Sequence, residues 1–222
     1  MKNLKKKIVV IALIVAIFAM TIASATITYF TDTSAQKNTF VVGDVEIDLG
    51  TDEPIVFDNV YPAQTLDVKG VISNTSERDG VYVAGIIEFT TNDSAENNIA
   101  DLLDTEEKVV AFLNGLNVNV DAETVGTKIV IDETTGTITV YVVLDTILAN
   151  GGTFALFNNV KVPAKWDKAE MAVLANTTLT VKAYATQTVG FNNGAEAIDG
   201  AFGGGADSSY DAFAPYFAVN GN

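Results

Sequence analysis

The chain has 222 residues, with 28 acidic and 13 basic side chains, a net charge of −15, and neither histidine nor cysteine. These absences exclude serine–histidine and cysteine–histidine nucleophiles, and they leave carboxylates as the remaining side-chain ligands for zinc. The acidic balance argues against a nucleic-acid partner, because binding to phosphates depends on clustered Lys and Arg.

The first 25 residues have the organisation of a signal peptide. Four lysines lie among the first seven residues, and an uncharged stretch follows. Its most apolar part, Ile8 to Ile22, would rise only about 22 Å as a helix, short of the ~30 Å core of a bilayer. Ala23, Ser24 and Ala25 are small residues in the arrangement that a signal peptidase accepts. We therefore expect cleavage after Ala25, secretion, and no stable membrane span after cleavage. The alternative is an uncleaved anchor.

The mature chain divides into three parts. Residues 26–42 form an N-terminal segment, residues 43–202 one domain, and residues 203–222 a tail rich in glycine and aromatic residues. About 200 residues can bury a sufficient core without disulfides. We expect the aromatic tail to dock either on its own domain or on a neighbouring molecule.

Short β-rich runs separated by Gly, Asn, Asp and Pro dominate the central domain. Their alternation of apolar and polar residues indicates half-buried strands, and one pair of runs around residues 133–136 indicates a hairpin. The pattern predicts an all-β fold, a two-sheet antiparallel sandwich of jelly-roll type with two or three short helices in the connections. The strands expected most clearly cover residues 45–49, 81–90, 128–132, 137–144 and 177–186.

Two helices are expected to interrupt the strands. Asp93 with Glu96, and Asp167 with Glu170, have the three-residue spacing of a capping box. Apolar residues at helical spacing extend the first helix across 99–113. We expect both helices to be structural caps.

Three acids are the candidate metal ligands. Asp44, Glu46 and Asp48 alternate along one expected strand, so their side chains share a face at about 7 Å spacing. Calcium takes oxygen ligands of this kind, whereas the absence of an acidic calcium-loop motif favours a simple solvated face. We expect no catalytic residue and no cofactor, with calcium as the alternative.

Two groups of motifs resemble a known family. The first follows the expected cleavage site and comprises residues 28–33, 38–40, Gly43 and the strand ending at Leu49. The second begins at Leu156-Phe157 and continues through Val162-Pro163, Trp166, Glu170-Met171, Leu174, residues 181–187 and Gly190-Phe191. In order and spacing these motifs resemble the TasA/camelysin (CalY) family, whose members are exported through a SipW-type signal peptidase.

The resemblance implies a structural role outside the cell. TasA-like members assemble into biofilm matrix fibres, in which the N-terminal segment of one subunit completes a sheet of its neighbour. Tyr29, Phe30, Phe40 and Val41 would then be the side chains that the neighbour buries. The partners implied are further copies of the chain, together with other matrix or anchor proteins. Deleting residues 26–42 should leave a folded sandwich that cannot extend a fibre.

Two other functions stay open at this point. Camelysin itself is described as a metallopeptidase, although the residues here offer no recognisable motif for that activity. A monomeric accessory protein that caps or anchors a fibre would have nearly the same sequence. The distinguishing feature is whether residues 26–42 pack into their own sandwich or remain available to another molecule.

Overall fold

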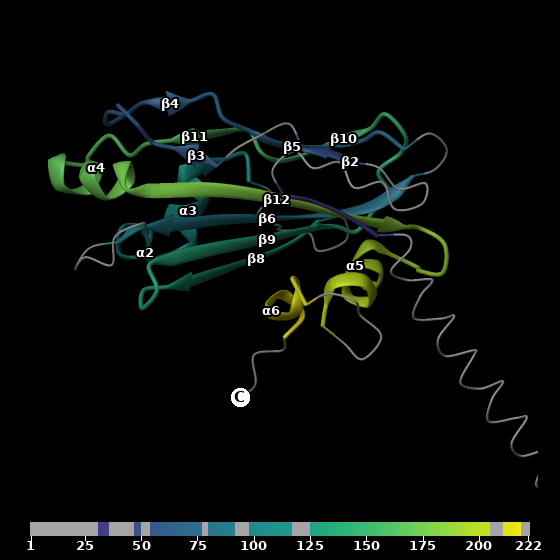
Figure 1. The fold of residues 1–222 in the computed structure, drawn as a ribbon. Helices are drawn as coiled ribbons and strands as arrows, with labels where there is room; N and C mark the ends of the chain where they lie inside the picture. The colour runs from purple at the N-terminus through teal and green to yellow at the C-terminus, as the bar shows by residue number, and fades with distance from the viewer. Residues whose placement is uncertain are drawn as a thin grey trace, which may run out of the picture.

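A large antiparallel sheet forms one layer of the molecule (Figure 1). The computed structural model describes residues 31–35, 47–49, 54–76, 80–91, 98–116, 125–204 and 211–218. The strand order is β1-β12-β6-β9-β8, and β3 pairs with another part of β12. The strands are β1 (Thr31–Ala35), β3 (Ile55–Val56), β6 (Val81–Thr91), β8 (Val125–Asp132), β9 (Thr137–Leu144) and β12 (Thr177–Gln187).

Two small sheets form the second layer. Their strand orders are β10-β5-β2 and β4-β11-β7, and Figure 1 shows them stacked on one face of the large sheet. The predicted antiparallel sandwich is therefore confirmed, with a second layer that is divided in two. The strands are β2 (Ile47–Leu49), β4 (Thr65–Leu66), β5 (Gly70–Asn74), β7 (Leu113–Asn114), β10 (Thr153–Phe157) and β11 (Asn159–Lys161).

The predicted hairpin is confirmed between β8 and β9. Asp132 and Thr137 are the last paired residues before the turn. The Asp132 carboxylate accepts hydrogen bonds from the backbone N–H groups of Thr134 (2.9 Å) and Thr135 (3.2 Å). Gly136 has a φ of 65°, a conformation that favours glycine. The turn chemistry therefore fixes the register of this strand pair.

A first hydrophobic cluster, the main core, fills the space between the layers. Alternate residues of β6, β9 and β12 point into it, as the period of a strand requires. Phe89 of the large sheet meets Phe112 at a ring distance of 5.7 Å, and Phe112 also contacts Trp166 at 5.7 Å. Burial of these large side chains is the main source of stability in a chain without disulfides.

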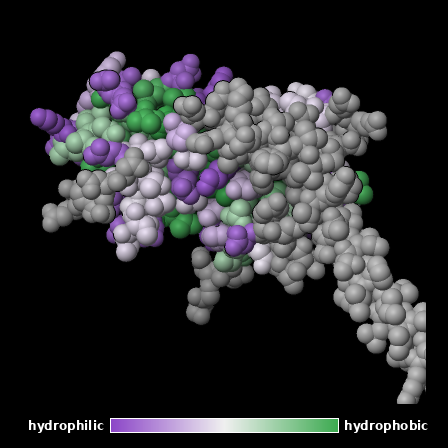
Figure 2. All heavy atoms as spheres, in the orientation of Figure 1, coloured by the Kyte–Doolittle hydropathy of each residue, from purple (hydrophilic) through white to green (hydrophobic). Residues whose placement is uncertain are grey.

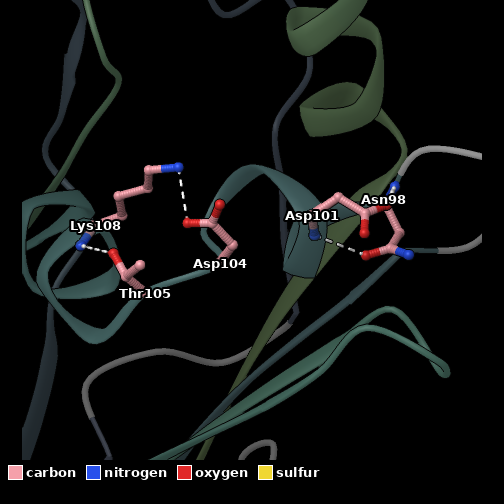
Figure 3. Close-up of polar contacts among 5 residues, drawn as sticks. All are labelled: Asn98, Asp101, Asp104, Thr105 and Lys108. Atoms are coloured by element: carbon pink, nitrogen blue, oxygen red, sulfur yellow. Dashed lines mark hydrogen bonds and ion pairs between the residues drawn. The ribbon is translucent and has the colours of Figure 1, made fainter.

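The first predicted helix is divided into α2 (Ile99–Leu102) and α3 (Glu106–Phe112). Asn98 begins α2 with a reciprocal capping box to Asp101, and the Thr105 side chain accepts from Lys108 N at 3.4 Å to begin α3 (Figure 3). Lys108 also pairs with Asp104 at 2.8 Å. A second cap inside the expected helix explains the break, because a capping residue has extended backbone. The predicted Asp93–Glu96 box lies outside the described residues.

The second predicted helix is confirmed as α4 (Lys168–Ala175). The Asp167 carboxylate accepts from Ala169 N (2.7 Å) and Glu170 N (3.1 Å), and the Glu170 carboxylate accepts from Asp167 N (2.6 Å). This reciprocal pattern is the capping box that the spacing predicted. Among the described residues, no helix has the length and apolarity needed to cross a bilayer.

A second hydrophobic cluster, the outer core, lies on the opposite face of the large sheet. The helices α5 (Gly194–Phe202) and α6 (Ala214–Phe217) cover this face (Figure 1). The Tyr184 ring lies 5.2 Å from that of Phe202 and 5.1 Å from that of Phe213, which is fully buried. The described part of the aromatic tail therefore docks on its own domain.

Among the described residues, the connections between strands contain three short helices, α2, α3 and α4, as expected. Sequence analysis missed α5, which follows the last strand. A local signal was present, because Asn193 and Glu196 have capping-box spacing. The Asn193 side chain accepts from Glu196 N at 2.8 Å. Hydrogen bonds from Asn192 hold the pKa of the Glu196 carboxyl below its ordinary value, so it stays charged at the helix N-terminus.

Candidate assembly site

The outer edge of β12 is where the N-terminal part of the chain meets the sandwich. β3 covers Thr178 and Leu179, and β1 covers the stretch from Lys182 to Thr186. The register of β1 runs from Thr31 opposite Thr186 to Ala35 opposite Lys182, in antiparallel orientation. Part of the predicted donor segment, residues 26–42, therefore lies in the chain's own sheet as an edge strand.

The side chains of β12 give this edge two different faces. Ala183 and Ala185 point into the main core and are fully buried. Lys182 and Tyr184 lie on the outer face, where Lys182 Nζ is 3.9 Å from a Glu88 carboxylate oxygen. Burial raises the pKa of Tyr184 to about 12, and the nearby charge of Glu88 adds to the shift. The inward face of β12 at this edge is therefore small and apolar.

The strand β2 lies close to β1 and β12, at the edge of the small sheet β10-β5-β2 (Figure 1). Its register places Asp48 opposite Ser73. Strands from the N-terminal part of the chain therefore close the same side of the sandwich in both layers. An N-terminal segment that moved to another molecule would open this side.

Most of the predicted site residues fall outside the described part of the chain. Asp48 is described, as part of β2. Within the described ranges, no three Asp, Glu, His or Cys residues gather closely enough to hold a metal ion. The cleavage, donor and calcium assignments therefore stay predictions. The residues not described are Ala23, Ser24, Ala25, Tyr29, Phe30, Phe40, Val41, Asp44 and Glu46.

A shallow depression of about 240 Å³ lies between α3 and the segment after β11. Hydrophobic residues gather on the surface near β4 and β11 (Figure 2). Ala63 has a φ of 67°, a strained conformation for a residue with a side chain. The lining contains no carboxylate that could activate water. It consists of Ala63, Ala111, Lys161, Val162, Pro163 and Ala164.

Sequence analysis identified β12 as a strand but not as the strand that receives the N-terminal segment. The β1 sequence, Thr-Asp-Thr-Ser-Ala, is short and polar and has no strong strand signal of its own. Its partner lies near the other end of the chain, so no local pattern could have indicated the pairing.

These observations define a class of protein, an antiparallel β-sandwich in which the N-terminal segment supplies an edge strand. Comparison with protein families matches residues 3–136, more than half of the chain, to the family described as camelysin metallo-endopeptidase. The chain belongs to the camelysin family, as the motifs near its start predicted. It is accordingly an extracellular or surface-associated protein.

Two further comparisons gave no relatives. Neither the curated proteins nor the solved structures include a significant match to this chain. The family match ends before the second group of motifs, which lies between Leu156 and Phe191. That distal resemblance is therefore not tested by the family match.

Proposed function

We propose that the protein is a secreted structural subunit of an extracellular fibre, and that it assembles by donating its N-terminal segment to the β12 edge of a neighbouring copy. In the described structure β1 occupies its own sheet, the arrangement expected of a monomeric accessory protein, so donation requires β1 to leave that sheet. What supports the proposal is the position of β1 at the outer edge of the large sheet, beside β12. A strand in this position can leave without passing through the core. Its departure exposes an edge of β12 with the same sequence and register in every copy.

The exchange is close to neutral in interaction free energy, because it replaces one set of contacts by an identical set. A donated β1 forms the same backbone hydrogen bonds with β12 of the neighbour as it forms with β12 of its own chain. Swapping identical elements between copies is therefore a low-cost route to association. Each subunit would donate one strand and receive one, so the contact repeats in one direction and a fibre grows.

Residues on both sides of β1 supply a reason for the equilibrium to favour the fibre. Tyr29 and Phe30 precede the strand, and Phe40 and Val41 follow it. Burial of a large apolar side chain contributes roughly 1.5–3 kcal/mol. If the neighbour buries these side chains more completely than the donor does, the difference offsets the entropy lost on association.

An engineered disulfide can distinguish donation of β1 to a neighbouring copy from a β1 that remains paired with β12 of its own chain. Ala35 and Lys182 are directly opposite, and directly opposite Cα atoms of antiparallel strands are about 4.5–5.5 Å apart, within reach of a disulfide. The chain has no cysteine, so the pair Ala35→Cys and Lys182→Cys has no competing thiol. We expect oxidation before assembly to link β1 covalently to β12 of its own chain, and so to abolish fibres. Oxidation after assembly should give a ladder of covalently linked chains on a non-reducing gel.

The pair Glu88→Cys and Thr180→Cys is the matched control. These residues are directly opposite on β6 and β12, one strand further in, and cannot exchange between molecules. This disulfide should leave fibre formation unchanged and produce no ladder. Fibres at normal yield from the locked Ala35–Lys182 variant would contradict donation. Monodisperse particles from the unmodified chain under all conditions would favour an accessory protein that caps or anchors a fibre.

We further propose that the chain has no peptidase activity and needs no cofactor, despite the name of the family. The support is chemical: the sequence has no histidine and no cysteine, and the depression beside α3 has no carboxylate in its lining. Casein digestion by homogeneous protein tests this proposal. Proteolysis that persists through purification and is abolished by a chelator would contradict it.

The same proposal places the mature N-terminus just before the donated segment. Cleavage after Ala25 would leave five residues ahead of β1. N-terminal sequencing of the exported protein should therefore begin at Thr26. A protein that still starts at Met1 and partitions with membranes would indicate an anchored subunit.

A further inference from the structure

The strand β8 forms the edge of the large sheet opposite to β1 and β12 (Figure 1). It is eight residues long, and within the described residues no strand pairs with its outer side. Ile129 and Ile131 pack against the main core, and Val130 packs against the outer core, but all three remain partly exposed. A long β-branched edge strand of this kind is a template for pairing with another strand.

The sequence of β8 is complementary to itself in antiparallel orientation. If Val130 faces Val130 of a second copy, then Lys128 faces Asp132, and Asp132 faces Lys128. The two isoleucines, Ile129 and Ile131, face each other in the same register. Each dimer would thus contain two opposite-charge pairs on one face and two apolar pairs on the other, both of which stabilise antiparallel strands.

We propose that β8 pairs antiparallel with β8 of a second copy of this chain, about a twofold axis at Val130, and so joins two molecules side by side. The two large sheets then become one continuous sheet, and the exposed parts of Ile129 and Ile131 are covered. The interface is isologous, because the same strand is used by both copies. It leaves β1 and β12 free at the far edges, so it is independent of fibre growth by strand donation.

The charged residues of β8 are held close to the strand by their own neighbours. Lys128 Nζ donates to the backbone oxygens of Pro215 (2.5 Å) and Ala218 (3.2 Å), which fixes the ammonium over the outer face. Hydrogen bonds from Thr135 and Thr134 hold the pKa of Asp132 below its ordinary value, so this carboxylate stays charged. The proposed pair between Lys128 and Asp132 of the second copy therefore has to share these groups with their present partners, which limits its contribution.

One strand pair is a small interface, so we expect weak association in solution. Along a fibre the same contact would repeat, and many weak contacts in parallel hold two fibres together. The measurements therefore use residues 26–222 with the Ala35–Lys182 disulfide closed. In that form β1 cannot leave its own sheet, and lateral pairing is observed without fibre growth.

Cysteine cross-linking tests the register. The variant Val130→Cys places a thiol on the proposed twofold axis and should form a covalent dimer under mild oxidation. The matched control is Thr139→Cys, which lies directly opposite Val130 on β9, on the same face and one strand further in. Two such positions would be about 14 Å apart in the proposed dimer, at roughly 4.8 Å per strand, too far for a disulfide. Equal cross-linking of both variants would overturn the register.

Charge reversal tests the pairing without relying on cysteine. Either Lys128→Glu or Asp132→Lys alone would set like charges opposite each other, and we expect each to weaken self-association by about tenfold or more in sedimentation experiments. A mixture of the two variants restores both opposite-charge pairs and should form mixed dimers at the original affinity. Loss of the α6 contact or of the turn cannot explain such rescue. Absence of dimers in the unmodified chain, or no rescue in the mixture, would overturn the proposal, whatever the result for strand donation.

Discussion

The main core and the outer core are built from opposite faces of the same three strands, β6, β9 and β12, yet they depend on different parts of the chain. The main core is closed by the second layer, whose strands all lie between residues 47 and 161. The outer core is closed by α5 and the residues around Phe213, which come from the last part of the described chain. One cluster therefore holds the sandwich together, and the other holds a covering segment on it. Removing a side chain from each should have different consequences.

The largest effect is expected in the main core. Phe89→Ala removes a fully buried ring that meets Phe112 at 5.7 Å, and it should lower the free energy of unfolding by about 3–5 kcal/mol. Denaturant unfolding measures this loss, and hydrogen exchange should accelerate across both layers. Phe89→Leu, which keeps most of the volume, is the control and should cost less. A loss below about 1 kcal/mol for the alanine variant would show that the layers can close over the gap.

The corresponding change in the outer core should be smaller and more local. Phe213→Ala removes a fully buried ring, but the segment that carries it can detach instead of leaving a cavity. We expect a loss of about 2–3 kcal/mol, below the main-core value for that reason. Hydrogen exchange should increase in α5 and α6 while β6 and β12 stay protected. Equal acceleration in all strands would contradict the separation of the two cores.

Alkaline pH should also act on the outer core. Burial raises the pKa of Tyr184 to about 12, and it raises the pKa values of Tyr141 and Tyr216. In the unfolded state these tyrosine side chains ionise with their ordinary pKa near 10. Burial of the neutral tyrosine side chains therefore contributes its full stabilisation of the folded state below pH 10. This stabilisation is lost as the pH rises toward 12. For Tyr184 this loss is about 2 kcal/mol by pH 12.

Stability measured between pH 9 and 12 tests this dependence. Tyr184→Phe keeps the ring and removes the ionising group, so its stability should fall less over this interval. A variant that falls as steeply as the unmodified protein would show that other groups control the alkaline transition.

The smallest effect concerns the fit of α6 on the edge of the sheet. A Cβ at Gly126 would overlap the hydroxyl of Tyr216, so Gly126→Ala should destabilise the contact by about 1 kcal/mol. The double variant Gly126→Ala with Tyr216→Phe removes the overlapping oxygen and should recover most of the loss. A thermodynamic cycle over the three variants measures the coupling. Additive effects would mean that Tyr216 moves away freely.

Several elements could be predicted from the sequence because their causes are local. Apolar and β-branched runs predicted the strands around residues 81–90, 137–144 and 177–186, and the Asp167–Glu170 spacing predicted α4. The hairpin at 133–136 was predicted from its turn residues. Each of these signals lies within a few residues of the structure that it specifies. The helix α5 had such a signal at Asn193 and Glu196, which was overlooked among the glycines.

The sequence by itself determined the acidic, cysteine-free character of the protein, the long strands of the large sheet, and the motifs near its start that assign it to the camelysin family. Only the tertiary structure decided that β1 pairs with β12 and that Phe213 is buried on the sheet. Both contacts join residues far apart in the chain. Their partners are selected by packing and by open backbone hydrogen bonds, which leave no periodic trace in the sequence. The same holds for the two sheet edges from which assembly is proposed.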